Sequence, residues 1–371
     1  AVNGMTAPNV TDVVYDPNST DGSKMVLSMT ETGGSRTLLS TDGGTSFSTL
    51  GAGGSRALDW WNGASGVQHI AATFGLGSDF LMVKSFKTSE GTGKLDMGDE
   101  LATSAATRDS KDNTVRKDFS FGSGVNPSGS TLSATNFVSG GGQTITSAIE
   151  GVAGKDMMLM SVNKCSDNIG PTGCTASAGS VALISLTVDA TSGNDSISGI
   201  KYFGSEVSAS GVTSVTGSGT YTAGVNAIQY CPAGSATKVA DTAFISVSGK
   251  GIYKISAVTS APAHAATGTT SGTYTEMKVD CDTGLIAVAG STGVFMSIDG
   301  GTKFFELKTS AAAGNNNPPQ QGQSTTALAV QADATSGDVT VAVASGNGDV
   351  KSVETSFTNM GLKGSEVAAG T

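Results

Sequence analysis

Few residues of this chain have the types and spacing that catalysis requires. Its two histidines, His69 and His264, stand in no recognisable motif, so a Ser-His-Asp or Cys-His site has little support. An acidic cluster at Asp96, Asp99 and Glu100 has the side-chain type that glycoside hydrolysis uses. The cluster lies in polar sequence, where a solvated loop is the better interpretation. We therefore expect no catalytic site and keep glycan hydrolysis as an alternative.

The adjacent Trp60 and Trp61 are a second candidate, because an aromatic ring offers a flat apolar face on which a sugar can stack. Neighbouring side chains on a strand point to opposite faces of the sheet. We therefore expect one tryptophan in the core and the other exposed. The exposed ring would suit a glycan-binding protein.

A turn that occurs twice is more informative than these candidates. The pattern S-x-D-G-G-T-x-F follows a short apolar run near each end of the chain. Paired glycines permit the positive φ of a tight hairpin. A short aspartate accepts backbone hydrogen bonds that hold the loop closed, and the aromatic ring five residues later packs under the hairpin. The defining positions are Ser40, Asp42, Gly44, Phe47, Ser297, Asp299, Gly301 and Phe304.

This pattern resembles the Asp box, S-x-D-x-G-x-x-W/F, of the sialidase-like (BNR-repeat) β-propeller superfamily. The resemblance implies a structural hairpin on the rim of a blade, away from any active site. It also raises sialidase chemistry, in which three arginines from different blades bind the substrate carboxylate. The four arginines of this chain all lie in its first third, without an R-I-P motif: Arg36, Arg56, Arg108 and Arg116. We therefore expect a non-catalytic member.

The elements that position these turns recur along the chain. A small-residue apolar strand, a glycine turn and a further strand appear in several aligned segments; the apolar strands are expected at 25–29, 242–248, 286–290 and 339–345. Such units, with a period of about 40 to 50 residues, predict an all-β propeller. Asp42 and Asp299 lie 257 residues apart, and one unit follows the second turn. The spacing predicts seven blades, with six as the alternative.

The chain has 371 residues, 52 of them glycine, which suits one large all-β domain with many turns. We expect the propeller at 10–363, flexible segments at 1–9 and 364–371, and a degenerate blade or insertion at 101–142. The apolar runs are too short to span a membrane. A net charge of −10 argues against nucleic acid or an anionic membrane as a partner.

The four cysteines can form two pairs. Cys165 and Cys174 bracket one loop, and Cys231 and Cys281 occupy the same place in two aligned repeats, at the end of the first strand. Two disulfides would indicate an oxidising compartment. Four free thiols in a cytosolic protein are the alternative. A zinc site is not expected, because the chain has no C-x-x-C motif.

Three glycosylation sequons begin at Asn9, Asn18 and Asn194, although sequons also arise by chance in Ser- and Thr-rich sequence. We expect no cofactor. Calcium is the alternative, because Asp-rich turns stand at 16–21, 189–195 and 333–338. None of them matches an EF-hand loop, and ordinary Asx turns explain them better.

These observations predict an extracellular, non-catalytic propeller that serves as a structural or interaction subunit of a cell-surface filament or layer. Its partners would be copies of itself or another surface protein, because an extended terminus can add a strand to a neighbour's sheet edge. The loop at 315–319 is a further candidate contact. A glycan-binding or glycan-hydrolysing propeller is the alternative function.

Overall fold

The structure is a computed structural model. It describes residues 9–31, 34–51, 57–64, 66–74, 80–87, 114–117, 144–165, 176–187, 196–204, 207–208, 211–212, 221, 223–234, 239–267, 272–290, 293–307, 325–333, 335–345 and 350–357. The chain divides into two compact units. Unit 1 comprises 1–206 with 215–222, and unit 2 comprises 207–214 with 223–371. Each unit is described by itself.

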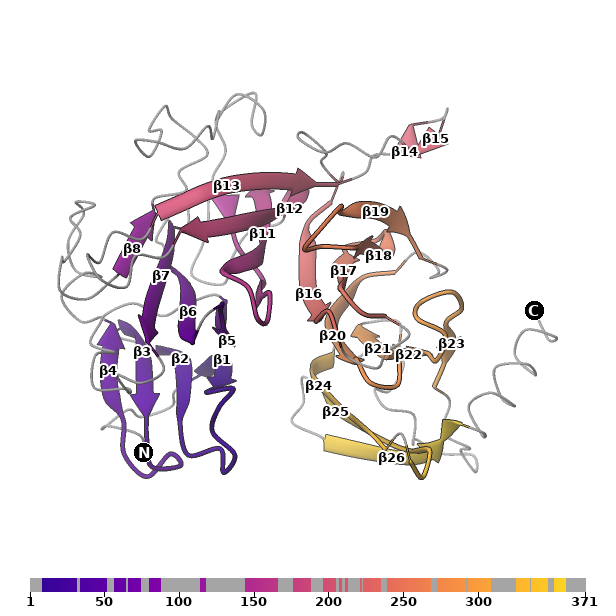
Figure 1. The fold of residues 1–371 in the computed structure, drawn as a ribbon. Helices are drawn as coiled ribbons and strands as arrows, with labels where there is room; N and C mark the ends of the chain where they lie inside the picture. The colour runs from indigo at the N-terminus through magenta and orange to yellow at the C-terminus, as the bar shows by residue number, and fades with distance from the viewer. Residues whose placement is uncertain are drawn as a thin grey trace. The chain divides into compact units, whose positions relative to one another are not determined.

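Unit 1 contains three antiparallel sheets (Figure 1). Sheet 1 has β1 (Asn9–Tyr15), β2 (Met25–Glu31), β3 (Gly34–Ser40) and β4 (Ser48–Gly51). Sheet 2 has β5 (Leu58–Asn62), β6 (Val67–Phe74), β7 (Phe80–Lys87) and β8 (Thr114–Lys117). Sheet 3 has β9 (Thr144–Ile145), β10 (Ile149–Gly151), β11 (Met157–Cys165), β12 (Ala176–Thr187) and β13 (Ser196–Phe203).

Unit 2 contains three more such sheets and a short ribbon (Figure 1). The ribbon is β14 (Val207–Ser208) with β15 (Gly211–Val212). Sheet 4 has β16 (Val225–Cys231), β17 (Thr242–Val247), β18 (Gly251–Ser256) and β19 (Ala263–Ala266). Sheet 5 has β20 (Tyr274–Asp280), β21 (Leu285–Gly290), β22 (Gly293–Ser297) and β23 (Phe305–Glu306). Sheet 6 has β24 (Thr325–Ala332), β25 (Asp338–Ser345) and β26 (Val350–Ser356).

Consecutive strands pair with one another as a meander in all six sheets, except that β9 and β10 of sheet 3 both pair with β11. A meander is the strand order of a propeller blade. Within each unit, the first strand of the meander in one sheet lies beside that of the next sheet: β1, β5 and β10 in unit 1, and β16, β20 and β24 in unit 2. The expected all-β, propeller-type fold is confirmed. The number of blades stays a prediction, and so do the domain limits.

The core lies between the faces of successive sheets. One cluster joins sheets 4 and 5, including Phe244, Tyr274 and Ile286, and another joins sheets 5 and 6, including Met296 and Val341. Every side chain of β17 and β21 is buried. Burial on both faces explains why these strands are continuous apolar runs in the sequence. β21 packs against sheet 4 on one face and against sheet 6 on the other.

The strands expected from the sequence form where the pattern places them, within a few residues at either end. The region 101–142 was expected to be a degenerate blade or an insertion. Part of it is β8, the fourth strand of sheet 2, which pairs with β7. The rest of that region, and the predicted loop contact at 315–319, lie outside the described residues.

Candidate functional site

The serines of the two S-x-D-G-G-T-x-F turns make the same hydrogen bonds. In the first, the Ser40 hydroxyl donates to Asp42 Oδ1 at 2.9 Å and accepts from the backbone N–H of Gly44 at 2.9 Å. In the second, Ser297 donates to Asp299 Oδ1 at 2.8 Å and accepts from Gly301 at 2.9 Å. Both serines are buried. The serine therefore closes each loop from inside, by bridging the aspartate and the second glycine.

The aspartate of each turn accepts hydrogen bonds from backbone N–H groups three or four residues later in the chain. Asp42 Oδ1 accepts from Ser46 at 2.9 Å, and Asp299 Oδ1 accepts from Thr302 at 2.9 Å and Lys303 at 3.0 Å. The hydroxyl and backbone N–H of Ser46 lower the pKa of Asp42 below its ordinary value, because they bond to the charged form. These carboxylate oxygens stabilise the turn.

The surroundings of the two turns differ. A Cβ added to Gly43 would meet nothing within 4 Å, and one on Gly44 would touch only Phe47 and Met25 of its own sheet. A Cβ on Gly300 would lie 2.9 Å from Val239, next to sheet 4. Gly301 is buried. The second turn is thus part of the packing between sheets, whereas the first lies at the surface of sheet 1.

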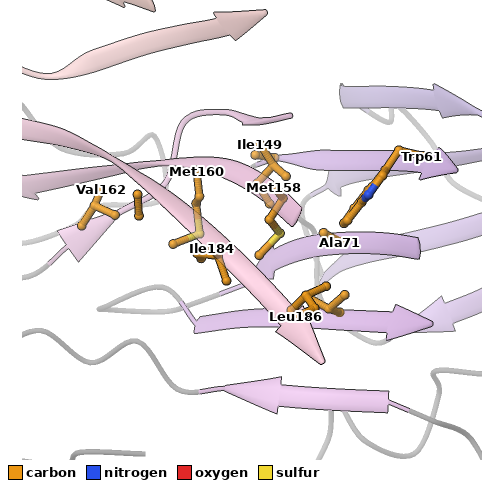
Figure 2. Close-up of a cluster of buried hydrophobic side chains, with 11 residues drawn as sticks. Trp61, Ala71, Ile149, Met158, Met160, Val162, Ile184 and Leu186 are labelled. Atoms are coloured by element: carbon orange, nitrogen blue, oxygen red, sulfur yellow. The ribbon is translucent and has the colours of Figure 1, made fainter. Parts of the chain in front are cut away.

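The expectation that Trp60 or Trp61 is exposed was wrong. Both rings are buried, with exposed fractions of 4% and 3%. Alternation does place them on opposite faces of β5, but sheet 2 is covered on both faces. Figure 2 shows Trp61 beside Met158 and Ile149 of sheet 3, and its Nε1 donates to the carbonyl of Lys155 at 3.1 Å. Neither ring is available to stack on a sugar.

A chain of polar contacts links the ends of β1, β5 and β10 and the start of β6, in sheets 1, 2 and 3. We call this group the polar clasp; it comprises Asp16, Asn18, Asn62, Gln68, His69 and Asp156. Buried Asp16 accepts from Gln68 Nε2 at 2.8 Å and from the backbone N–H of Asn18 at 2.9 Å. The amides of Asn18 and Asn62 bond reciprocally, at 3.1 and 3.0 Å. Sheets 1 and 2 are therefore joined by side-chain hydrogen bonds.

His69 and Asp156 continue the polar clasp to sheet 3. The fully buried His69 ring bonds through Nε2 to Asp156 Oδ1 at 2.9 Å and stacks on Trp61 with ring centroids 4.8 Å apart. Asp156 Oδ1 also accepts from the backbone N–H of Ala64 at 2.9 Å. Burial acts to raise the pKa of Asp156, but the hydrogen bonds from His69 and Ala64 outweigh it and the pKa lies below its ordinary value. A histidine held in this way is a structural residue.

Unit 2 uses a covalent bond at the corresponding place. A disulfide joins Cys231, at the end of β16, to Cys281, just after β20. This is the pairing expected from the aligned repeats. The neighbouring Tyr230 hydroxyl donates to Asp241 Oδ1 at 3.0 Å, and Thr259 donates to the same carboxylate through its backbone N–H and its hydroxyl. Burial and this hydrogen bond raise the pKa of Tyr230.

The second histidine, His264, is also buried. It has an exposed fraction of 8%, and its ring stacks on Tyr253 with centroids 5.4 Å apart. Burial lowers its pKa to about 4, so the ring is neutral at physiological pH. Both histidines therefore lie inside the packing, where a substrate cannot reach them.

Other predicted residues are only partly described. Asp21 accepts from Ser23 N–H and from the Ser19 hydroxyl, and Asp333 accepts from Thr335 and Ser336 N–H, as Asx turns do. Among the described residues no group of three or more His, Cys, Asp or Glu is placed to hold a metal ion. Several candidates lie outside the described residues: Arg56, Arg108, Asp96, Asp99, Glu100, Cys174 and Asn194. The Cys165–Cys174 disulfide stays a prediction, and so does glycosylation at Asn9, Asn18 and Asn194.

Sequence reasoning missed a set of polar side chains on the first strands that bond to the next sheet. Asp12 Oδ2 accepts from the backbone N–H of Leu58 at 2.9 Å, and Asp59 Oδ2 accepts from that of Gly151. In unit 2, Asn226 Nδ2 donates to the carbonyl of Tyr274 at 3.1 Å. The available signal was a short Asp or Asn inside a predicted strand, where β-propensity disfavours it.

Comparisons with known proteins assign no family. No family model matches the chain, and no curated protein is significantly similar to it. Solved structures that it resembles include the Swd1 β-propeller domain of Myceliophthora thermophila, with 12% identity over 95% of this chain and 88% of that one and a TM-score of 0.44. Another is Sqt1 of Chaetomium thermophilum bound to the N-terminus of a ribosomal protein, with 9% identity over 95% and 88% of the chains and a TM-score of 0.46.

A third is the extracellular domain of a one-component system of B. thetaiotaomicron, with 11% identity over 93% of this chain and 33% of that one and a TM-score of 0.39. Likeness at this level carries no argument about function. Within the part of the chain that the structure describes, no helix has the length and apolarity needed to cross a membrane.

Proposed function

We propose that this chain is an exported, non-catalytic propeller protein that serves as a structural or interaction subunit of a cell-surface assembly. The observation that carries the proposal is that the histidine side chains are buried and that several of the described aspartate side chains are hydrogen-bonded to neighbouring protein groups. Both histidines are buried, and the Asp42, Asp156, Asp241 and Asp299 carboxylates bond to neighbouring protein groups. Chemistry-bearing residues are thus used to hold sheets and turns together.

The buried disulfide supports an oxidising compartment for the proposed function. Disulfides persist in secreted and cell-surface proteins and are rare in the cytosol. Cys231 is fully buried and Cys281 is half-buried. A bond in this position acts as a structural link between two sheets.

An exposed apolar strand supports the proposed contact with copies of the chain. β1 exposes Val10, Val13 and Tyr15, with exposed fractions of 52%, 42% and 52%. Apolar side chains grouped at a surface mark a contact with another molecule more often than side chains exposed singly do. β1 begins at Asn9, where the terminal segment predicted at 1–9 ends, and that segment is the one expected to take part in strand addition.

Electron microscopy of the native material tests the proposal, and regular filaments or a surface lattice are the expected result. Light scattering of the purified chain would measure assembly in solution. The double variant Val13→Ser/Tyr15→Ser should reduce assembly, while Val350→Ser, which changes another exposed valine, should leave it intact. Dispersed monomers at every concentration, or glycan hydrolysis that one acidic substitution abolishes, would overturn the proposal.

A further inference from the structure

The polar clasp contains a dipeptide that is chemically reactive in flexible chains. Asn62 is followed by Gly63, and the chain has two other Asn-Gly pairs, at Asn3 and Asn347, which lie outside the described residues. Because glycine has no side chain to shield its nitrogen, the Gly63 nitrogen is able to attack Asn62 Cγ when the backbone moves freely. The sequence thus offers three potential sites of one modification.

This reaction, deamidation, converts the side-chain amide to a carboxylic acid and needs no oxidant or reductant. A bond forms between the Gly63 nitrogen and Asn62 Cγ, the bond from Cγ to the amide nitrogen breaks, and ammonia leaves with the proton of the Gly63 N–H. Water then opens the five-membered ring to aspartate or isoaspartate. Overall, one water molecule is consumed and one ammonia molecule is released.

The groups that must move in this reaction are held by hydrogen bonds. The side-chain amide of Asn62 is paired with that of Asn18 at 3.1 and 3.0 Å. The Gly63 N–H donates to the carbonyl of Val67 at 2.8 Å, and the Asn62 carbonyl accepts from the Gly154 N–H at 2.7 Å. Both the nucleophilic nitrogen and the amide under attack are therefore fixed by partners in sheets 1, 2 and 3.

We propose that Asn62 is a latent deamidation site that the polar clasp keeps closed and that reacts when sheets 1 and 2 part at this end. An aspartate product cannot donate to Asn18 Oδ1, so the reciprocal pair is lost. An isoaspartate product routes the main chain through the side chain of residue 62, which lengthens it by one methylene before Gly63. It also turns the Asn62 carbonyl that accepts from Gly154 into a free carboxylate, so the present hydrogen bonds of Asn62 and Gly63 cannot all be kept. Deamidation would therefore prevent the clasp from closing again. This inference does not depend on the proposed function.

The test compares variants of the full chain after prolonged incubation at neutral pH, with peptide mass spectrometry to follow the mass change from amide to acid at each Asn-Gly pair. Asn18→Ala should accelerate the reaction at Asn62 about tenfold, because losing the amide pair makes local opening easier by about the value of one hydrogen bond. Thr20→Ala is the matched control. It removes the same sequon and changes an exposed residue of the same turn, but it keeps the Asn18–Asn62 pair, so its rate should equal that of the wild type.

The wild-type protein provides a second measurement that does not require a folded variant. In increasing urea, the rate at Asn62 should rise to the rate that Asn62 has in the fully unfolded chain only where unit 1 unfolds, as followed by hydrogen exchange. Deamidation of native Asn62 as fast as in urea would overturn the proposal. An Asn18→Ala protein that retains its fold and shows the wild-type rate would also overturn it.

Discussion

Where the first strand of a sheet ends, unit 1 carries hydrogen-bonding side chains and unit 2 carries a disulfide. Asp16 and Cys231 hold the same position in two aligned segments, because Tyr15-Asp16-Pro17 follows the same pattern as Tyr230-Cys231-Pro232. Asp16 bonds to Gln68 of sheet 2, and Cys231 bonds covalently to Cys281 beside sheet 5. Both links join consecutive sheets at corresponding turns.

The comparison shows that one architectural need is met by two kinds of chemistry. A hydrogen bond contributes only about 0.5–1.5 kcal/mol net, so the polar clasp requires several partners with mutually compatible geometry. The disulfide acts through a single bond that restricts the unfolded chain. The clasp is sensitive to protonation and side-chain changes, whereas the disulfide is sensitive to reduction.

Removing the disulfide should give the largest effect. The bond spans 50 residues, so loop-closure entropy assigns it about 4 kcal/mol of the free energy of unfolding. Cys231→Ala/Cys281→Ala should therefore lower the stability of unit 2, measured by segment-resolved hydrogen exchange in urea, and leave unit 1 unchanged. Equal losses in both units would show that the link is not local to sheets 4 and 5.

Acid should destabilise unit 2 through His264. Its folded-state pKa is about 4, below the unfolded value of about 6.5, so the unfolded chain binds the extra proton. The stability that the neutral, buried ring contributes is present above pH about 6.5 and is lost as the pH falls toward 4. The free energy of unfolding falls by at most on the order of 3 kcal/mol from this group. Urea titrations of the wild type and His264→Phe should diverge across this window; parallel curves would contradict the prediction.

Asp156→Ala should weaken unit 1 by about 2 kcal/mol, because it leaves the buried His69 ring without its carboxylate partner. Lys155→Ala is the matched control, since that residue is exposed and contributes its backbone carbonyl to Trp61. The lowered pKa of Asp156 means that its contribution is present above its ordinary unfolded pKa and is lost as the pH falls through the folded value. Denaturant titration at neutral and acid pH measures both effects, and equal losses for the two variants would exclude this role for the carboxylate.

The smallest expected effect is the difference in stability cost between the same substitution in the two repeated turns. Ser297→Ala should cost about 1–2 kcal/mol and Ser40→Ala about 0.5–1 kcal/mol. Both serines make the same hydrogen bonds, but the second turn packs against sheet 4 and the first does not. Thermal unfolding of the two variants measures the difference. Equal costs would show that the hydrogen bonds alone, and not the packing, set the importance of the turn.

The sequence by itself determined the repeated elements. The alternation of apolar strands with glycine turns located the strands of sheets 1, 4, 5 and 6, because strand pairing within a meander is local and depends on nearby residues. The same alignment identified Cys231 and Cys281 as partners, since equivalent places in adjacent sheets are neighbours. The serine, aspartate and glycines of the two turns likewise act over a few residues, so their spacing in the chain is also their spacing in space.

Only the tertiary structure decided what covers each face of a sheet. Burial of Trp61 depends on sheet 3, which comes from a distant part of the chain. The pairing of His69 with Asp156 across 87 residues depends on the same sheet. Period-two alternation reports which side of a strand a residue occupies, but it cannot report whether that side faces water or another sheet. The polar clasp was therefore invisible in the sequence, although the residues that form it were in view.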